Sequence, residues 1–145
     1  MSEPDLPQTL VHLAQTFLVL GEEIAAGAGL TPQQWAVLHQ VGAAGGEGVL
    51  PSAIAEASGT SRANVTKLVR GLTRLALVRV GSDPADGRQR RLRLTPSGAR
   101  VLRRLDGEKA RRITAALEGL AASERATLHR LGSRLLSRLG RRLLA

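Results

Sequence analysis

Apolar residues recur near the start of the chain at alternating steps of four and three, which places them on one face of a helix. We therefore predict an amphipathic helix over residues 6–26, ended by Gly27 and Gly29. Its apolar face is formed by Leu6, Leu10, Leu13, Phe17, Leu20 and Ile24.

A capping signal predicts the second helix. Residues 31–34 read Thr-Pro-Gln-Gln, the spacing of a capping box with proline at the first helical position. The helix should run to about Val41 with Trp35 and Leu38 on one face, and a flexible loop should follow over residues 42–48. We interpret Trp35 as a core residue rather than a ligand-stacking residue, because the chain has one Trp, one Phe and no Tyr, and its core needs the volume.

Two short helices, over residues 51–57 and 61–75, are predicted next. Apolar and polar residues then alternate over residues 77–81 and 91–94, which is the pattern of strands. The segment between them, residues 82–87, is dense in turn-forming residues. The chain should therefore form a β-hairpin here.

Two leucine-striped helices are predicted for the C-terminal part, the first opened by Thr95-Pro96 and the second by Ser123-Glu124. Together with the first helix, they carry more leucine than a small domain can cover, so we expect a second copy of the chain to bury these stripes. Beside the last stripe lies a row of arginines that is either a solvated face or a partner for the acidic N-terminal third of the second copy. The row consists of Arg130, Arg134, Arg138 and Arg141.

The segment from Pro51 to Arg70 carries the strongest functional signal. A helix-turn-helix needs a small residue where its helices cross, a glycine that turns left-handed, and apolar residues that hold the second helix down. Ala55, Gly59 and Val65 stand at the required offsets. An ordinary helical hairpin with a solvated basic face is the alternative, but it does not require these three residues together.

With the apolar face of this second helix turned inward, its leading and outward positions hold short polar and cationic residues. Such residues reach base edges and phosphates from a helix in the major groove. The candidate DNA-binding residues are Ser61, Arg62, Ala63, Thr66, Lys67 and Arg70.

Charge is distributed unevenly along the chain, whose net charge is +9. Residues 1–61 hold six acidic residues and no Lys or Arg, whereas residues 62–93 carry a net +7 and residues 94–145 a net +8. Codon bias toward arginine explains the type of base but not this asymmetry. We therefore interpret the switch at Arg62 as the start of a polyanion-binding surface.

Residues 79–98 contain an ungapped pattern, Asp-x-Arg-x-x-x-Leu-x-Leu-Thr, with a glycine three residues later. Its members are Asp86, Arg88, Leu92, Leu94, Thr95 and Gly98, preceded by Arg79, Asp83 and Pro84. This pattern, together with segment 30–38, resembles the MarR family of bacterial regulators. The resemblance implies a mainly α fold: a winged helix-turn-helix with a two-stranded β wing, flanked by N- and C-terminal dimerisation helices.

The resemblance also implies roles for the wing. Arg88 would enter the minor groove of DNA, and Asp86 would hold it. Arg90 lies beside them, and its charge suits the same narrow, electronegative groove. Two positions depart from the family: Ala76 replaces a glycine that usually ends the recognition helix, and Leu50-Pro51 replaces a polar cap.

The resemblance implies one unit over residues 1–145, with a DNA-binding region over residues 30–98 and dimerisation helices over residues 5–29 and 99–145. It implies a homodimer that binds an inverted repeat of double-stranded DNA.

The predicted function is sequence-specific regulation of transcription, as a repressor released by a small-molecule effector. In the family, a small aromatic or anionic effector often binds between the dimer helices and the winged region, where Trp35 and His39 would be its lining in this chain. A nonspecific architectural DNA-binding protein is the alternative. A nonspecific binder needs only cationic side chains. Ser61 and Thr66 lie among the basic residues of this helix, which favours the sequence-specific regulator.

Composition excludes several other classes. The chain has no cysteine, which removes disulfides, thiolate nucleophiles and cysteine-ligated zinc. His12, His39 and His129 have no catalytic or metal-binding spacing, so we expect no enzyme activity, no cofactor and no metal. No apolar run is long enough to span a membrane, and the acidic start does not resemble a signal peptide, so we expect a cytoplasmic protein.

Overall fold

The computed structural model describes residues 5–82, 85–87 and 90–139. In these residues the chain forms six α-helices, a short 3-10 helix and a two-stranded antiparallel sheet, which confirms the predicted mainly α fold with a two-stranded wing. The elements are α1 (Leu6–Gly27), α2 (Pro32–Ala44), η1 (Gly45–Glu47), α3 (Pro51–Ser58), α4 (Arg62–Arg74), β1 (Val78–Ser82), β2 (Arg90–Leu94), α5 (Pro96–Leu117) and α6 (Ala122–Leu139).

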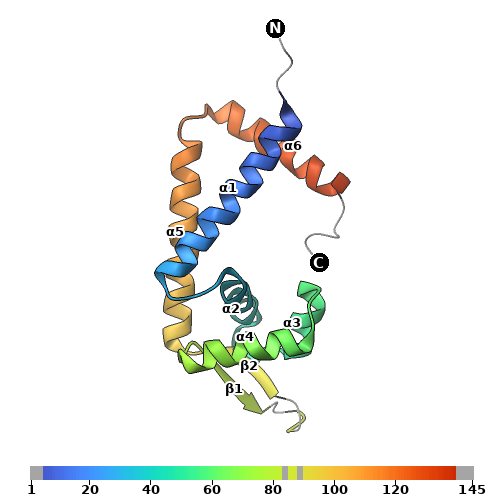
Figure 1. Ribbon diagram of the computed structural model, residues 1–145, viewed down its shortest axis with the longest axis vertical. Helices are drawn as coiled ribbons and strands as arrows, with labels where there is room; N and C mark the ends of the chain where they lie inside the picture. The colour runs from blue at the N-terminus through green and yellow to red at the C-terminus, as the bar shows by residue number, and fades with distance from the viewer. Residues whose placement is uncertain (1–4, 83–84, 88–89, 140–145) are drawn as a thin grey trace.

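The elements gather into two groups, which Figure 1 shows at opposite ends of the molecule. One group contains α2, α3, α4 and the sheet, and the other is an open frame of α1, α5 and α6. Helix α5 belongs to both, because it packs against β2 and α2 and also against α1. We call the first group the winged unit.

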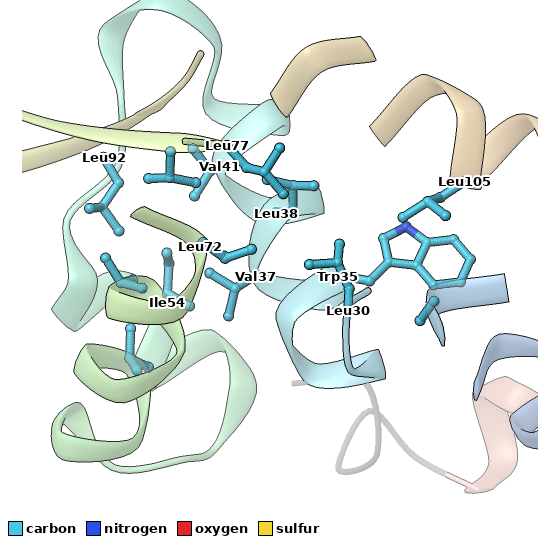
Figure 2. Packing of buried hydrophobic residues seen from close by; sticks show 14 of the residues in the cluster. Leu30, Trp35, Val37, Leu38, Val41, Ile54, Leu72, Leu77, Leu92 and Leu105 are labelled. Carbon is cyan, nitrogen blue, oxygen red and sulfur yellow. The ribbon is translucent and has the colours of Figure 1, made fainter. Parts of the chain in front are cut away.

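The hydrophobic core lies mainly inside the winged unit and is completed by Ile24 and Ala25 of α1 and by Leu105 of α5. Figure 2 shows apolar side chains from α2, α3, α4 and the sheet meeting there, with Leu105 of α5 beside Trp35. Leu38, Ile54 and Leu72 are fully buried. Trp35 is only 8% exposed and belongs to this cluster, as predicted. Burial of large aliphatic side chains stabilises the fold by roughly 1.5–3 kcal/mol each.

Local caps fix where the helices begin. The predicted capping box at α2 is present: Thr31 Oγ1 accepts from Gln34 N at 3.1 Å, and Gln34 Oε1 accepts from Thr31 N at 3.0 Å. At α4 and α5 the cap is a single hydrogen bond: Ser61 Oγ accepts from Asn64 N, and Thr95 Oγ1 accepts from Gly98 N. No side chain caps the N-terminus of α3, whose N-cap is Leu50.

The expected flexible loop over residues 42–48 is wrong in part. Helix α2 continues through Ala44, and η1 follows at once. The guanidinium of Arg93 explains the ordered turn, because it donates to the carbonyl oxygens of Gly46 at 2.8 Å and Glu47 at 3.1 Å. These contacts join residues far apart in the sequence, so no local pattern predicts them.

Two positions beside the wing restrict the backbone, one before β1 and one in α5. Ala76 has a φ of 56°, the left-handed conformation that a glycine would adopt without strain. For alanine this costs on the order of 1 kcal/mol. Further along, Gly98 in the first turn of α5 lies against Leu77, and a Cβ at Gly98 would overlap the Leu77 carbonyl oxygen. The wing is thereby held close to the start of α5.

Within the described parts of the chain, none of the helices combines the length and apolarity needed to cross a bilayer.

Candidate nucleic-acid interface

Helices α3 and α4 form the predicted helix-turn-helix. Gly59 ends α3 with a φ of 62°, in the left-handed region. Ala55 is buried, and Ile54 and Val65 are fully buried between the two helices and the rest of the core. The small residue, the turning glycine and the apolar anchor therefore each do what the sequence pattern predicted.

Helix α4 has two chemically distinct faces. Val65, Val69 and Leu72 turn inward and are buried. All six predicted DNA-binding residues of this segment are exposed: Ser61, Arg62, Ala63, Thr66, Lys67 and Arg70. The structure thus brings these residues together on one accessible surface.

Hydrogen bonds at the start of α4 give its polar residues different tasks. Ser61 Oγ accepts from Asn64 N at 3.1 Å, so Ser61 caps the helix. The Thr66 hydroxyl donates to the carbonyl of Arg62 at 2.9 Å, which leaves its oxygen lone pairs and its methyl group to face outward. Asn64, which the sequence reasoning did not select, donates to Thr60 Oγ1 at 2.9 Å.

A groove of about 650 Å³ runs along one flank of α4. Its walls are α4 and the start of α2, which approach each other at Gly71, where an added Cβ would lie 2.6 Å from Gln34 Nε2. Lys67, Arg70 and Arg74 line it and form no ion pair with other described residues. Arg74 was missed, although it follows Arg70 by one helical turn.

The wing is built from β1 and β2, paired from Val78 with Leu94 to Ser82 with Arg90. Its arginines are not equivalent. Arg93 is bound to the η1 turn, and Arg91 Nη1 donates to the carbonyl of Gly48 at 3.3 Å. Arg90 and Asp86 are exposed. Arg88, the predicted minor-groove residue, lies outside the described residues, as do Asp83 and Pro84.

A second hollow, of about 320 Å³, lies between α1 and α2. Trp35 and His39, the two predicted ligand-lining residues, both line it, and so does Lys109 of α5. The other lining residues are Phe17, Leu18, Gly21, Pro32 and Ala36. We call this space the α1–α2 hollow.

One carboxylate connects the two predicted ligand residues. Trp35 Nε1 donates to Asp106 Oδ1 at 3.0 Å, and His39 Nδ1 lies 3.3 Å from Asp106 Oδ2. Lys109 Nζ lies 5.5 Å from the centroid of the Trp35 ring, within cation–π range. Sequence reasoning missed Asp106 and Lys109, because nothing near them in the chain marks a contact 71 residues away.

Among the described residues, no group of three His, Asp or Glu side chains is placed to hold a metal ion.

Comparison with known proteins places this geometry in a family. The MarR family model matches residues 28–89. The PcaV transcriptional regulator from Streptomyces coelicolor is 32% identical over 92% of this chain and 95% of its own, with a TM-score of 0.69. A probable transcriptional regulator from Pseudomonas aeruginosa is 30% identical over 92% of this chain and 98% of its own, with a TM-score of 0.66.

A third solved structure shows the same fold at lower identity. It is the Staphylococcus aureus MepR–DNA complex, 19% identical over 94% of this chain and 99% of its own, with a TM-score of 0.74. No curated protein sequence matches the chain. The family model and the two relatives at 30% identity or more show that the chain belongs to the MarR family of transcriptional regulators.

Proposed function

We propose that this regulator binds duplex DNA sequence-specifically as a homodimer, with α4 in the major groove and the wing in the adjacent minor groove. The observation that carries the proposal is the division of α4 into a buried apolar face and an exposed face of short polar and cationic residues. A helix of this kind fits the major groove and presents its N-terminal residues to base edges. The MepR structure, of similar fold, is a complex with DNA.

The uncharged residues between the arginines of α4 favour sequence-specific binding over a nonspecific architectural role. Arg62 and Arg70 alternate with Ala63 and Thr66 on the exposed face. Ala63 and the Thr66 methyl offer apolar contact to a thymine methyl, and the Thr66 oxygen offers an acceptor to base amino groups. A binder that recognises only phosphates has no use for such groups.

The homodimer is supported by apolar side chains that the single chain leaves exposed on α1 and α6. Phe17 is 50% exposed and Leu139 is 70% exposed. They belong to two rows, Leu6, Leu10, Leu13 and Phe17 on α1 and Leu128, Leu131, Leu135 and Leu139 on α6. Apolar patches of this extent on a soluble chain mark a protein interface. In this proposal residues 5–29 and 99–145 are the dimerisation helices and residues 30–98 the DNA-binding region.

We further propose repression released by a small aromatic or anionic effector that occupies the α1–α2 hollow. The hollow has aromatic walls, Phe17 and Trp35, and Lys109 supplies a cation at its edge. One wall belongs to α1 and the other to the winged unit, so a ligand there changes how the two groups pack. An effector that prefers the DNA-free form weakens DNA binding by the ratio of its two affinities.

Selection of bound sites from a random DNA pool tests the proposal. We expect an inverted repeat whose half-site centres lie about one helical turn apart. Binding to the selected site should fall with salt at a log–log slope of about −5 to −9, which corresponds to roughly 6–10 phosphate contacts. Failure to enrich any sequence, with undiminished binding to random DNA, would instead establish the architectural role.

A further inference from the structure

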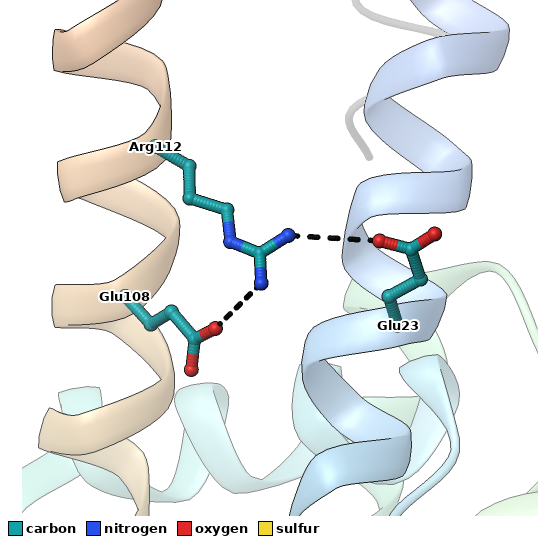
Figure 3. Close-up of polar contacts among 3 residues, drawn as sticks. All are labelled: Glu23, Glu108 and Arg112. Carbon is teal, nitrogen blue, oxygen red and sulfur yellow. Dashed lines mark hydrogen bonds and ion pairs between the residues drawn. The ribbon is translucent and has the colours of Figure 1, made fainter.

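Helix α5 passes from the winged unit to the α1–α6 frame near its middle. Its first half is anchored by Gly98 against Leu77 and by Leu105, which is buried in the core. Beyond Leu105 the described part of α5 has no buried residue. In its second half, Arg112 lies 3.6 Å from Glu23 of α1 and 3.0 Å from Glu108 of its own helix, as Figure 3 shows. Asp106 stands at the point of transition.

Both carboxylate oxygens of Asp106 contact α2. One accepts the hydrogen bond from Trp35 Nε1 and the other lies beside His39 Nδ1. Across the described residues, these are the hydrogen bonds and ion pairs that join α2 to α5. The Trp35 bond is partly buried, so it is less screened by water than an exposed pair.

The position of α2 in turn fixes the position of α4. The two helices pack together, and Gly71 of α4 has no side chain at the point where the Gln34 amide approaches. Gln34 is itself held by the capping box at the start of α2. A displacement of α2 relative to α5 therefore moves α4 as well.

We propose that Asp106 is a positioning residue that sets the placement of α4 relative to the dimerisation helices, and that an anionic ligand bound by Lys109 in the α1–α2 hollow acts by competing with Asp106 for His39. The inference rests on the proposed function, since it concerns how the DNA-binding helices are spaced and released. Asp106 itself does not line the hollow. The two residues that it contacts, Trp35 and His39, do line it.

The competition follows from the charges around the hollow. Lys109 is the cationic side chain among its lining residues, and His39, which also lines it, presents a ring nitrogen to Asp106. A ligand carboxylate that binds Lys109 and His39 takes the His39 ring from Asp106 and places a second anion beside the Asp106 carboxylate. Like charges at close range disfavour each other, so the Asp106 contacts with α2 weaken as the ligand binds.

Half-site spacing provides the first test. The wild-type dimer should prefer its selected operator over versions with one base pair added or removed between half-sites by about tenfold or more, because each change displaces and rotates one half-site. Asp106→Ala should reduce this ratio to about twofold to threefold while keeping the helical circular-dichroism signal. Glu108→Gln, which removes a carboxylate of α5 that contacts Arg112 rather than α2, should keep the wild-type ratio.

Unchanged spacing preference in a folded Asp106→Ala variant that still binds DNA overturns the inference and leaves the proposed function intact. Absence of DNA binding by the wild-type protein overturns both. A variant that loses its helical signal is replaced by Asp106→Asn, whose amide oxygen still accepts from Trp35 but no longer offers a negative charge to His39. For this variant we expect an intermediate ratio, and a wild-type ratio overturns the inference.

Trp35 fluorescence provides the second test, with benzoate as the probe. Trp35 is the one Trp in a chain without Tyr, so emission excited at long wavelength reports this site alone. Benzoate should change the wild-type emission and lower DNA affinity by at least about fivefold. Asp106→Asn should bind benzoate several-fold more tightly, and benzoate should release DNA from it less effectively. Equal benzoate affinity in the two proteins overturns the proposed competition with Asp106. A wild-type protein whose emission and DNA affinity do not change with benzoate overturns the proposal that the hollow binds an anionic ligand.

Discussion

At the scale of single residues, the exposed cations of α4 divide into two kinds by position. Arg62 stands at the leading end of the helix, next to the Ser61 cap. Lys67 and Arg74 lie on the flank that faces the start of α2, where they line the groove. The start of α2 flanks this groove, so a phosphate oxygen is a better-fitting occupant than a base edge. We therefore expect Arg62 to contact base edges and Lys67 to contact the DNA backbone.

Substitution of these two cations should have distinguishable effects. Lys67→Ala should weaken binding equally on the operator and on random DNA, and should make the salt slope shallower by about 2 per dimer, one phosphate from each half-site. Arg62→Ala should relax specificity at one position per half-site by roughly 1–3 kcal/mol. Fluorescence anisotropy over a salt series measures both, with Arg111→Ala on the exposed part of α5 as the control. Equal effects of the two substitutions would contradict this division.

A second residue-scale prediction concerns Gly98. A Cβ at this position overlaps the Leu77 carbonyl oxygen, which is backbone and cannot rotate away. Gly98→Ala should therefore lower the free energy of unfolding by about 1–3 kcal/mol or more, as overpacking does. Gly27→Ala is the matched control, because nothing lies within 4 Å of its added Cβ and alanine favours the helix. Thermal unfolding of the two variants should shift in opposite directions.

At the scale of elements, sequence reasoning succeeded where structure depends on neighbours in the chain. The capping box at Thr31, the left-handed turn at Gly59 and the buried face of α4 follow from residues within one or two helical turns. It failed where distant residues meet. The bonds of Arg93 to η1 and of Asp106 to Trp35 join residues that no local pattern connects.

The wing shows how this difference alters the candidate site. The sequence places several arginines on the hairpin as one basic group, but in the structure Arg93 binds η1 and Arg90 is exposed.

Arg93→Ala should lower the free energy of unfolding by about 1 kcal/mol and accelerate amide exchange over residues 45–48, because two carbonyls lose their donor. Arg90→Ala should leave stability unchanged and weaken DNA binding. Hydrogen exchange and anisotropy on both variants separate the two roles, and equal stability of the two variants would show that the Arg93 bonds contribute nothing.

At the scale of the whole molecule, the single chain is incomplete on one side. The core of the winged unit is closed by Ile24 and Ala25 of α1 and by Leu105 of α5, whereas α1 and α6 also expose apolar rows that nothing in the described chain covers. Residues 1–61 hold acidic residues but no Lys or Arg, and the basic residues begin at Arg62, so the charge asymmetry of the sequence follows this division only in part. Residues 94–145 are also basic, although α6 lies in the frame rather than beside α4.

Assembly through these rows gives the last prediction. The protein should sediment as a dimer at micromolar concentration and protect both half-sites of its operator.

Leu135→Glu on α6 should produce monomers, because a two-fold axis places the substitution on both sides of the interface. Loss of two buried leucine side chains removes roughly 3–6 kcal/mol, or about 10²–10⁴ in the dimerisation constant. Ser137→Glu, on the opposite face of α6, adds the same charge away from the leucine row and should remain dimeric. The Leu135→Glu monomer should keep its helical signal, because the described part of α6 contributes no buried residue to the core, and it should bind a single half-site weakly. A Leu135→Glu protein that still sediments as a dimer would place the interface elsewhere, and a wild-type monomer would contradict the assignment of α1 and α6 to dimerisation.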